Sequence, residues 1–173
     1  PGYGKTMNLS MLYHFISGYV DGKETKALFN SLAITRYPDH MAHQGSHLAI
    51  FLTFEGIEPD SFHEAKEQIF ELFYKLYQEY QYLLDSKKIS DRHKYFFEAM
   101  LTKRVNSTQL QTALWFLAEC IFYHHNGKPW LLVDAYDTPI QAGRKYGYEN
   151  EITAFISSMF DSALEVNPFF QRA

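Results

Sequence analysis

The stretch from Trp130 to Ile140, WLLVDAYDTPI, constrains the fold of this chain more than any other part of the sequence. Four apolar residues lead directly into Asp134, and Pro139 soon closes the segment. A short apolar run bounded by turn signals is typical of a strand that is buried on both faces, as in a parallel sheet. An acidic residue at the carboxyl end of such a strand lies where open α/β sheets bind ligands. We therefore expect a ligand site at Asp134.

The amino-terminal residues Pro1 to Thr6 read PGYGKT, and G-K-T is the closing half of a phosphate-binding loop. Apolar residues then recur at three and four positions, which predicts a helix over 7–19 that ends near Gly18. The free amide groups and the dipole at the start of such a helix attract phosphate. Only part of the motif can be tested, because its first glycine would precede Pro1. The alternative is an ordinary helix start with Thr6 near the cap.

The remaining pattern predicts an α/β fold in a single domain over residues 1–173. The run LAIFLTF at 48–54 predicts a second buried strand. Apolar periodicity predicts helices over 24–32, 61–84, 90–103, 106–123 and 151–166, while 34–45 and 138–150 are interpreted as polar connections. Strands that alternate with helices favour a parallel sheet. The tyrosines at 74, 77, 80 and 82 lie on a predicted helix, and their helical spacing favours core and rim positions over base stacking.

Composition argues against several classes of function. The formal net charge of -4 gives no electrostatic support for nucleic-acid binding. No apolar run approaches the length that spans a bilayer, so we expect no membrane partner. The single cysteine, Cys120, lies in an apolar run and is interpreted as a core residue, which fits a reducing, cytoplasmic compartment. His40, His43 and His47 are irregularly spaced and are only weak candidates for a metal site.

The G-K-T residues and Asp134 together suggest one site for a nucleotide and Mg²⁺. Amides of the amino-terminal loop would hold the phosphates, and Lys5 would neutralise the β- and γ-phosphates. The Thr6 hydroxyl and Asp134 would hold the metal. The predicted cofactor-binding residues are Gly2, Tyr3, Gly4, Lys5, Thr6 and Met7. The alternative for Asp134 is a carboxylate that caps a turn at the end of a strand.

The sequence resembles the AAA-ATPase-like domain family of bacterial proteins. The similar stretches are GKTMNLSML, LAIFLTFEGI with the helix QIFELFYKLYQEYQYLL, and DAYDTPI followed by GYENEITAFISSMFDSALEVNPFFQRA. They occur in family order and cover nearly the whole chain. The resemblance implies a P-loop NTPase with a three-layer αβα fold that binds ATP and Mg²⁺. Relatives often carry a nuclease-like domain after this one, so that domain and other subunits are the partners the resemblance implies.

One departure from the family concerns catalysis. The family usually has Glu at the position of Ala135, and that Glu is the base expected to orient the attacking water. Losing such a group typically lowers the rate by about 10²–10⁴-fold, so we expect weak or absent hydrolysis. In an extended segment Asp137 would share a face with position 135, which makes it a partial substitute as a catalytic residue. The alternative for Asp137 is capping of the turn before Thr138 and Pro139.

A second departure is that the chain looks incomplete. The family's strand before the phosphate loop and its strand after Ala173 fall outside the sequence, so we expect strands 48–54 and 130–133 to be neighbours. Arg144 and Lys145 follow the acidic motif and either reach a phosphate or a subunit, or are solvated loop charges. Two other functions remain open. One is a non-catalytic interaction module that keeps the fold, and the other is a nucleic-acid-processing enzyme, which the acidic charge does not support.

Overall fold

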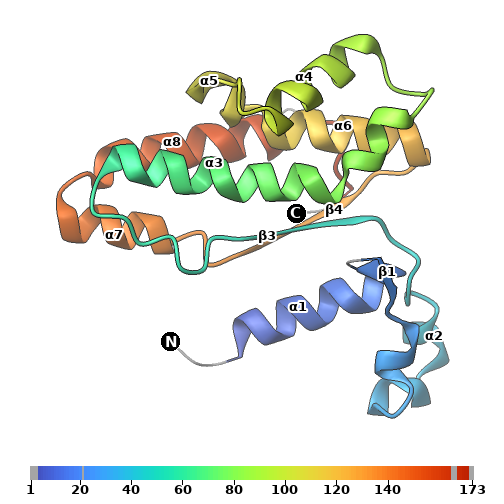
Figure 1. Ribbon diagram of the computed structural model, residues 1–173. Helices are drawn as coiled ribbons and strands as arrows, with labels where there is room; N and C mark the ends of the chain where they lie inside the picture. The colour runs from blue at the N-terminus through green and yellow to red at the C-terminus, as the bar shows by residue number, and fades with distance from the viewer. Residues whose placement is uncertain (1–3, 21, 165–166, 172–173) are drawn as a thin grey trace.

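The structure is a computed structural model that describes residues 4–20, 22–164 and 167–171. A two-stranded parallel sheet of β3 and β4 lies between α1 on one side and the remaining long helices on the other (Figure 1). No helix within the described ranges is long and apolar enough to cross a membrane. The elements are α1 (Lys5–Ile16), β1 (Tyr19–Val20), β2 (Lys23–Glu24), η1 (Lys26–Phe29), η2 (Ala33–Arg36), α2 (Pro38–Met41), β3 (Ala49–Thr53), α3 (Phe62–Glu79), η3 (Gln81–Asp85), α4 (Asp91–Leu101), α5 (Ser107–Gln111), α6 (Ala113–His125), β4 (Trp130–Asp134), α7 (Thr138–Tyr146) and α8 (Glu149–Leu164).

The sheet pairs two strands that are 81 residues apart in sequence. Ala49 pairs with Trp130 at one end, and Thr53 pairs with Asp134 at the other. The amide of Phe54 extends the pairing by donating to the Asp134 carbonyl oxygen at 3.0 Å. This arrangement confirms the two predicted strands and their predicted neighbourhood. It supports the α/β class, in which helices cover both faces of a parallel sheet.

Helix α1 covers one face of the sheet through a small apolar cluster. Phe15 and Ile16 pack with Ala49 and Leu132, and Phe51 stacks on the ring of Tyr13 at 5.3 Å between centroids. This confirms the helix predicted after the G-K-T residues. Because side chains alternate along a strand, the residues of β3 and β4 that contact α1 are every second one.

The last turn of α1 is tied to the segment that leads into β3. The amide of Gly45 donates to the Phe15 carbonyl at 2.9 Å, and the amide of His47 donates to the Ile16 carbonyl at 3.0 Å. These bonds satisfy two carbonyl groups that a helix end otherwise leaves unpaired. Gly18 and Gly45 allow the close approach, since a Cβ on Gly45 would lie 3.3 Å from the Cα of Gly18.

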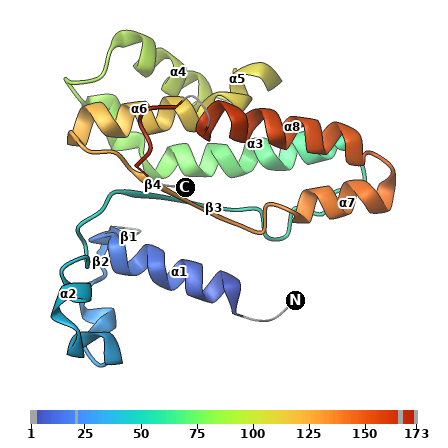
Figure 2. The same cartoon turned by 180° about the vertical axis from the view of Figure 1, so that it is seen from behind.

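The other face of the sheet contacts the main core. Ile50, Leu52 and Leu131 are buried there against α3, α6 and α8, and α4 and α5 form a further layer outside (Figure 2). The phenol of Tyr77, fully buried, donates to the Ala113 carbonyl at 2.8 Å. Cys120 is 1% exposed in this core, as the sequence predicts, and burial raises the pKa of its thiol to about 12.

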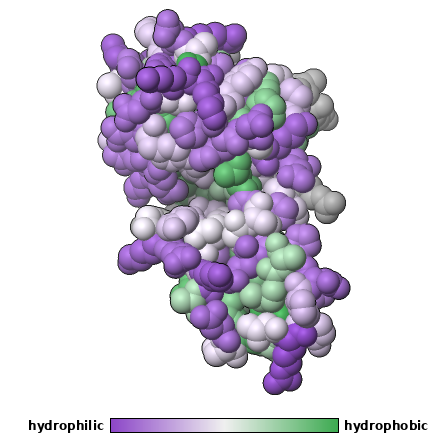
Figure 3. All heavy atoms as spheres, turned by 90° about the vertical axis from the view of Figure 1, so that its right-hand side faces the viewer, coloured by the Kyte–Doolittle hydropathy of each residue, from purple (hydrophilic) through white to green (hydrophobic). Residues whose placement is uncertain are grey.

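The region between α1 and β3 differs from the sequence prediction. The helix predicted over 24–32 is wrong: the chain forms the short hairpin β1–β2 and then the 3₁₀ turn η1. Of the larger apolar residues in this stretch, Phe29 is buried, but Leu28 is 60% exposed and Leu32 is 41% exposed. Figure 3 views this end of the molecule and shows apolar residues on the surface of the lower part. The 34–45 connection contains η2 and α2.

Several helix limits also differ from prediction. Residues 106–123 form two helices, α5 and α6, and the residue that ends α6, Asn126, is left-handed with a φ of 57°. The predicted loop at 138–150 is wrong, because α7 occupies most of it. Pro139 lies in the first turn of α7, where its missing N–H is harmless, and Gly147 ends the helix with a φ of 88°. Helix α3 ends at Glu79, and the predicted end of the last helix at 166 lies outside the described residues.

Candidate functional site

Asp134 ends β4 and is buried, with 8% of its surface exposed. It alternates with Trp130 and Leu132, which both contact the cluster under α1, so it lies on the sheet face that α1 covers. Its Oδ2 accepts a long hydrogen bond of 3.5 Å from the Thr53 hydroxyl. Within the described ranges Thr53 is the only hydrogen-bond partner of this carboxylate. A buried carboxylate with one weak partner keeps capacity to bind a cation.

The first turn of α1 supplies polar groups at the same end of the sheet. Gly4 takes a left-handed conformation as the residue before the helix, with a φ of 69°. Lys5, Thr6 and Met7 are exposed, and the first helical bond runs from the Asn8 amide to the Gly4 carbonyl. The amides of residues 5–7 therefore have no partner within the helix, and the first turn holds no acidic residue. Figures 1 and 2 both show this end of α1 on the side where β3 and β4 end.

The predicted residues Gly2 and Tyr3 lie outside the described residues. The structure thus brings the helix start at Gly4, Lys5 and Thr6 to the same end and face of the sheet as Asp134. Met7 is 70% exposed on the same turn. The direct contacts of these groups with a ligand stay a prediction.

The chain turns sharply after Asp134. Ala135 has a φ of 53°, and its carbonyl accepts a hydrogen bond of 3.0 Å from the Thr138 amide. The premise that Asp137 lies in an extended segment and shares a face with position 135 is therefore wrong. Asp137 is exposed at the start of α7, and its Oδ2 accepts a hydrogen bond of 2.7 Å from Nε2 of Gln141. It makes no side-chain cap bond, and its catalytic role stays a prediction.

Arg144 and Lys145 lie on α7, not in a loop. The Arg144 guanidinium pairs with Oε1 of Glu149 at 2.7 Å. The hydrogen bond to Glu149 raises the pKa of Arg144, and the same bond lowers the pKa of Glu149. Lys145 places its Nζ 4.7 Å from the ring centroid of Tyr146. Both cations are exposed, and their contacts link α7 to itself and to α8.

A family profile described as "Predicted AAA-ATPase" matches residues 2–173. The chain belongs to this family. No curated protein and no solved structure gave a significant match. Membership in the AAA-ATPase-like family supports an ATP-binding domain of the AAA type, and the carboxyl ends of β3 and β4 are where such an α/β domain binds its ligand.

Two polar residues at this end of the AAA-ATPase-like domain, Thr53 and Glu55, were not predicted from the sequence as site residues. Thr53 contacts Asp134, and its hydroxyl also accepts a hydrogen bond of 3.2 Å from the amide of Glu55. Both residues lie in the second half of the LAIFLTFEGI stretch, from which only a strand and its end were predicted. Their position after a buried strand was a usable signal, because carboxyl ends of neighbouring parallel strands meet at one edge. The register that sets Thr53 beside Asp134 was not readable from the sequence.

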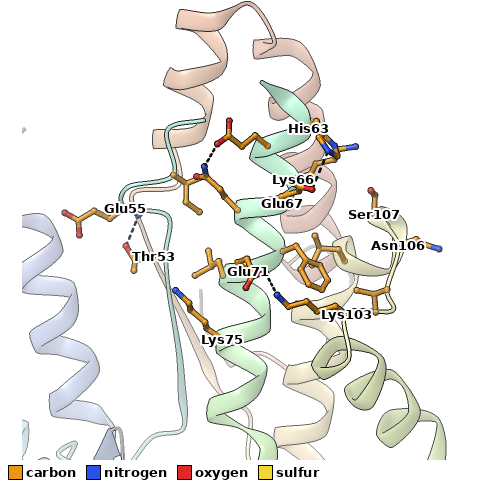
Figure 4. A pocket seen from close by; sticks show the side chains of 17 residues that line it. Thr53, Glu55, His63, Lys66, Glu67, Glu71, Lys75, Lys103, Asn106 and Ser107 are labelled. Atoms are coloured by element: carbon orange, nitrogen blue, oxygen red, sulfur yellow. Dashed lines mark hydrogen bonds and ion pairs between the residues drawn. The ribbon is translucent and has the colours of Figure 1, made fainter. Parts of the chain in front are cut away.

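A separate hollow of about 910 Å³ lies along the outer face of α3, between the end of β3 and α5 (Figure 4). Two pairs of its charged side chains contact each other: Lys103 with Glu71, and Nε2 of His63 with Oε1 of Glu67 at 3.4 Å. Asp134 is not among its lining residues. Thr53 and Glu55 lie at its rim, so the hollow adjoins the candidate ligand site of the AAA-ATPase-like domain without including Asp134.

Proposed function

We propose that this AAA-ATPase-like domain has a P-loop fold and binds Mg-ATP where β3 and β4 end. The observation that carries the proposal is the position of Asp134, which is buried at the end of β4 on the face covered by α1. The first turn of α1, with unpaired amides and an exposed lysine, lies at the same end (Figure 1). A cation ligand and an anion-attracting helix start are the two parts that a metal–triphosphate site requires.

Each residue has a distinct physical task in this proposal. Lys5 would place its ammonium on the β- and γ-phosphates, and the amides of residues 5–7 would donate to phosphate oxygens. Thr6 and Asp134 would hold Mg²⁺, which prefers hydroxyl, carboxylate and water oxygens. The donor set fits that ion, since the Asp134 carboxylate has only the weak 3.5 Å contact with Thr53 to satisfy it. When bound, Mg²⁺ neutralises charge on the phosphates.

Slow hydrolysis is part of the same proposal. Ala135 offers a methyl group where the family usually has the glutamate that orients water, and a methyl group cannot accept a proton. The absence of such a base typically lowers the rate by about 10²–10⁴-fold. A domain that binds ATP and turns it over slowly suits a nucleotide-dependent switch. Its proposed partners are other subunits or a nuclease-like domain of the parent protein.

A second candidate is an interaction module that keeps the fold without binding nucleotide. It is favoured by the apolar outer surface of α1, where Met7 is 70% exposed and Met11 is 48% exposed. Exposed methionines one helical turn apart are suited to contacts with a partner surface. Ala135 also fits this candidate. Lys5 and Thr6 count against it, because a decayed site has no physical need for them.

Calorimetry with Mg-ATP separates the two candidates. We expect binding by the wild-type protein and a loss of affinity of about 10–100-fold in Lys5→Ala, because a charged hydrogen bond contributes about 1.5–3 kcal/mol. Lys23→Ala is the matched control, since Lys23 is an exposed lysine in the hairpin beyond the other end of α1. Equal affinities of the two variants would argue against the site. A folded protein that produces no binding heat would leave the interaction module as the better account.

A further inference from the structure

We infer that Glu55 supplies, less directly and from the neighbouring strand, the water-activating carboxylate that Ala135 cannot provide, so that the slow turnover proposed above depends on Glu55. This inference rests on the proposed Mg-ATP site and names the residue responsible for its turnover. Glu55 follows β3, the strand that pairs with β4, and so lies beside the acidic motif instead of within it. The inference joins three observations: the register of the two strands, the direction of the Glu55 side chain, and the absence of partners for its carboxylate.

The strand register brings Glu55 to the edge where Asp134 lies. Thr53 pairs with Asp134, and neighbouring strands lie about 4.8 Å apart. The Thr53 hydroxyl donates to Oδ2 of Asp134 at 3.5 Å and accepts from the Glu55 amide at 3.2 Å. One hydroxyl therefore connects the backbone of Glu55 to the proposed metal ligand. This contact holds the start of the turn after β3 against the end of β4.

The direction of the side chain also points to this site. Phe54 is fully buried in the core on the α3 side, whereas Glu55, in the turn that follows β3, is exposed. Figure 4 shows the Glu55 side chain directed away from α3, toward the side on which α1 lies. The next residue, Gly56, has a φ of 79° and turns the chain away, which leaves Glu55 exposed at the end of the strand.

The carboxylate of Glu55 is free to act, whereas that of Asp137 is engaged. Within the described residues the Glu55 side chain has no hydrogen bond or ion pair, although it lies at the rim of the hollow along α3. Asp137 accepts the 2.7 Å bond from Gln141 and lies beyond the sharp turn at Ala135. A group that removes a proton must have an accessible oxygen that can reach the attacking water. Glu55 meets the first condition better than Asp137 does.

The reaction balances with Glu55 in this role. Its carboxylate accepts one proton from a water molecule while the water oxygen forms a bond to the γ-phosphorus. The bond between that phosphorus and the oxygen that bridges to ADP breaks, and its electron pair leaves with ADP. The products are ADP and inorganic phosphate, and Glu55 then returns its proton to solvent. No oxidant, reductant or further reactant is required.

The test compares Glu55→Gln with Glu58→Gln and Asp137→Asn in the full-length protein. Glu58 is an exposed carboxylate three residues further along the same loop, which makes it a matched control. Two quantities are measured: the dissociation constant for Mg-ATP by calorimetry, and the rate of phosphate release. The nucleotide that stays bound after gel filtration is also identified as ATP or ADP. Melting temperatures check that each variant is folded, and Glu55→Asp gives a second, conservative change.

We expect E55Q to bind Mg-ATP with wild-type affinity, to release phosphate about 10²–10⁴-fold more slowly, and to retain its nucleotide as ATP. E58Q should match the wild type, and Ala135→Glu added to E55Q should restore turnover. Turnover by E55Q within about threefold of wild type would overturn the inference, as would a loss in D137N alone. A wild type that binds Mg-ATP without hydrolysing it overturns the role of Glu55 and leaves the proposed binding intact. A wild type that does not bind overturns both.

Discussion

The contact between α7 and α8 leaves no room for a side chain at Gly143, which makes Gly143→Ala a sharp test of this packing. A Cβ at Gly143 would lie 2.6 Å from Cγ2 of Ile152 and 3.0 Å from the Cα of Glu149. Ile152 is fully buried, so its methyl group cannot swing away. Carbon atoms in contact are normally about 3.5–4.0 Å apart, and α8 must therefore retreat by about 1 Å.

The change in the free energy of unfolding of G143A is the sum of two opposing effects. Inserting a methyl group into a packed core typically costs about 1–3 kcal/mol. Replacing glycine by alanine inside a helix returns up to about 1 kcal/mol. We therefore expect G143A to lower the free energy of unfolding by about 1–2 kcal/mol. For a urea dependence of about 2 kcal/mol per molar, the unfolding midpoint falls by about 0.5–1 M.

A second glycine provides the control for this experiment. Gly127 is not left-handed, and a Cβ there would meet only Cδ1 of Leu48, the end of a flexible side chain, at 3.3 Å. We expect Gly127→Ala to change the free energy of unfolding by no more than about 0.5 kcal/mol. Urea unfolding followed by circular dichroism compares both variants with the wild type. An unchanged or higher midpoint for G143A would refute the argument that Gly143 is required by the close packing of α7 against α8.

Two further predictions concern Ala135 and Cys120. Ala135→Gly should raise the urea midpoint: a left-handed residue other than glycine costs about 1–2 kcal/mol, of which the more flexible unfolded chain offsets about 0.4–1 kcal/mol. A lower midpoint would contradict the strained turn. Burial raises the pKa of Cys120 to about 12, so iodoacetamide at pH 8 should label the native protein on the order of 10³-fold more slowly than the unfolded chain, whose thiol has a pKa of about 8.5. Above about pH 8.5 the unfolded state loses the Cys120 thiol proton while the native state keeps it. The free energy of unfolding should therefore fall as pH rises from about 8.5 toward 12. Urea titrations at pH 7.5 and 9.5 should show a smaller fall for Cys120→Ala.

The parts of the fold that could be predicted are those with long, regular apolar patterns. The strands at Ala49–Thr53 and Trp130–Asp134 read as continuous apolar runs, and helices such as α3 show a clear apolar stripe. The hairpin β1–β2 has strands of two residues each, which is too short for any periodicity to appear. Helix α7 was missed because Pro139 was interpreted as the end of a strand. It is instead the start of a helix, whose other apolar positions are few.

The candidate site was only partly readable, because its geometry depends on contacts between distant residues. Asp134 and Lys5 could be selected from local motifs. The pairing of Thr53 with Asp134 joins residues 81 positions apart, and nothing local fixes that register. The left-handed turn at Ala135 could not be predicted, because no glycine lies at that position. The orientation assigned to Asp137 was wrong for this reason. Glu55 gained its significance only once β3 was known to lie beside β4.

The anchoring of α1 at one end has a mechanical consequence. Its last turn is bound to the backbone of Gly45 and His47, whereas its first turn carries exposed side chains and amides without helical partners. The helix is therefore held in place at its last turn and less constrained at its first turn. Because these bonds hold the last turn in place, a displacement of the first turn would tilt the helix about its last turn. Tilt changes how α1 presses on Phe51 and Leu132 in the middle of the sheet. Binding of a ligand at the start of α1 would therefore change how α1 packs against the face shared by β3 and β4.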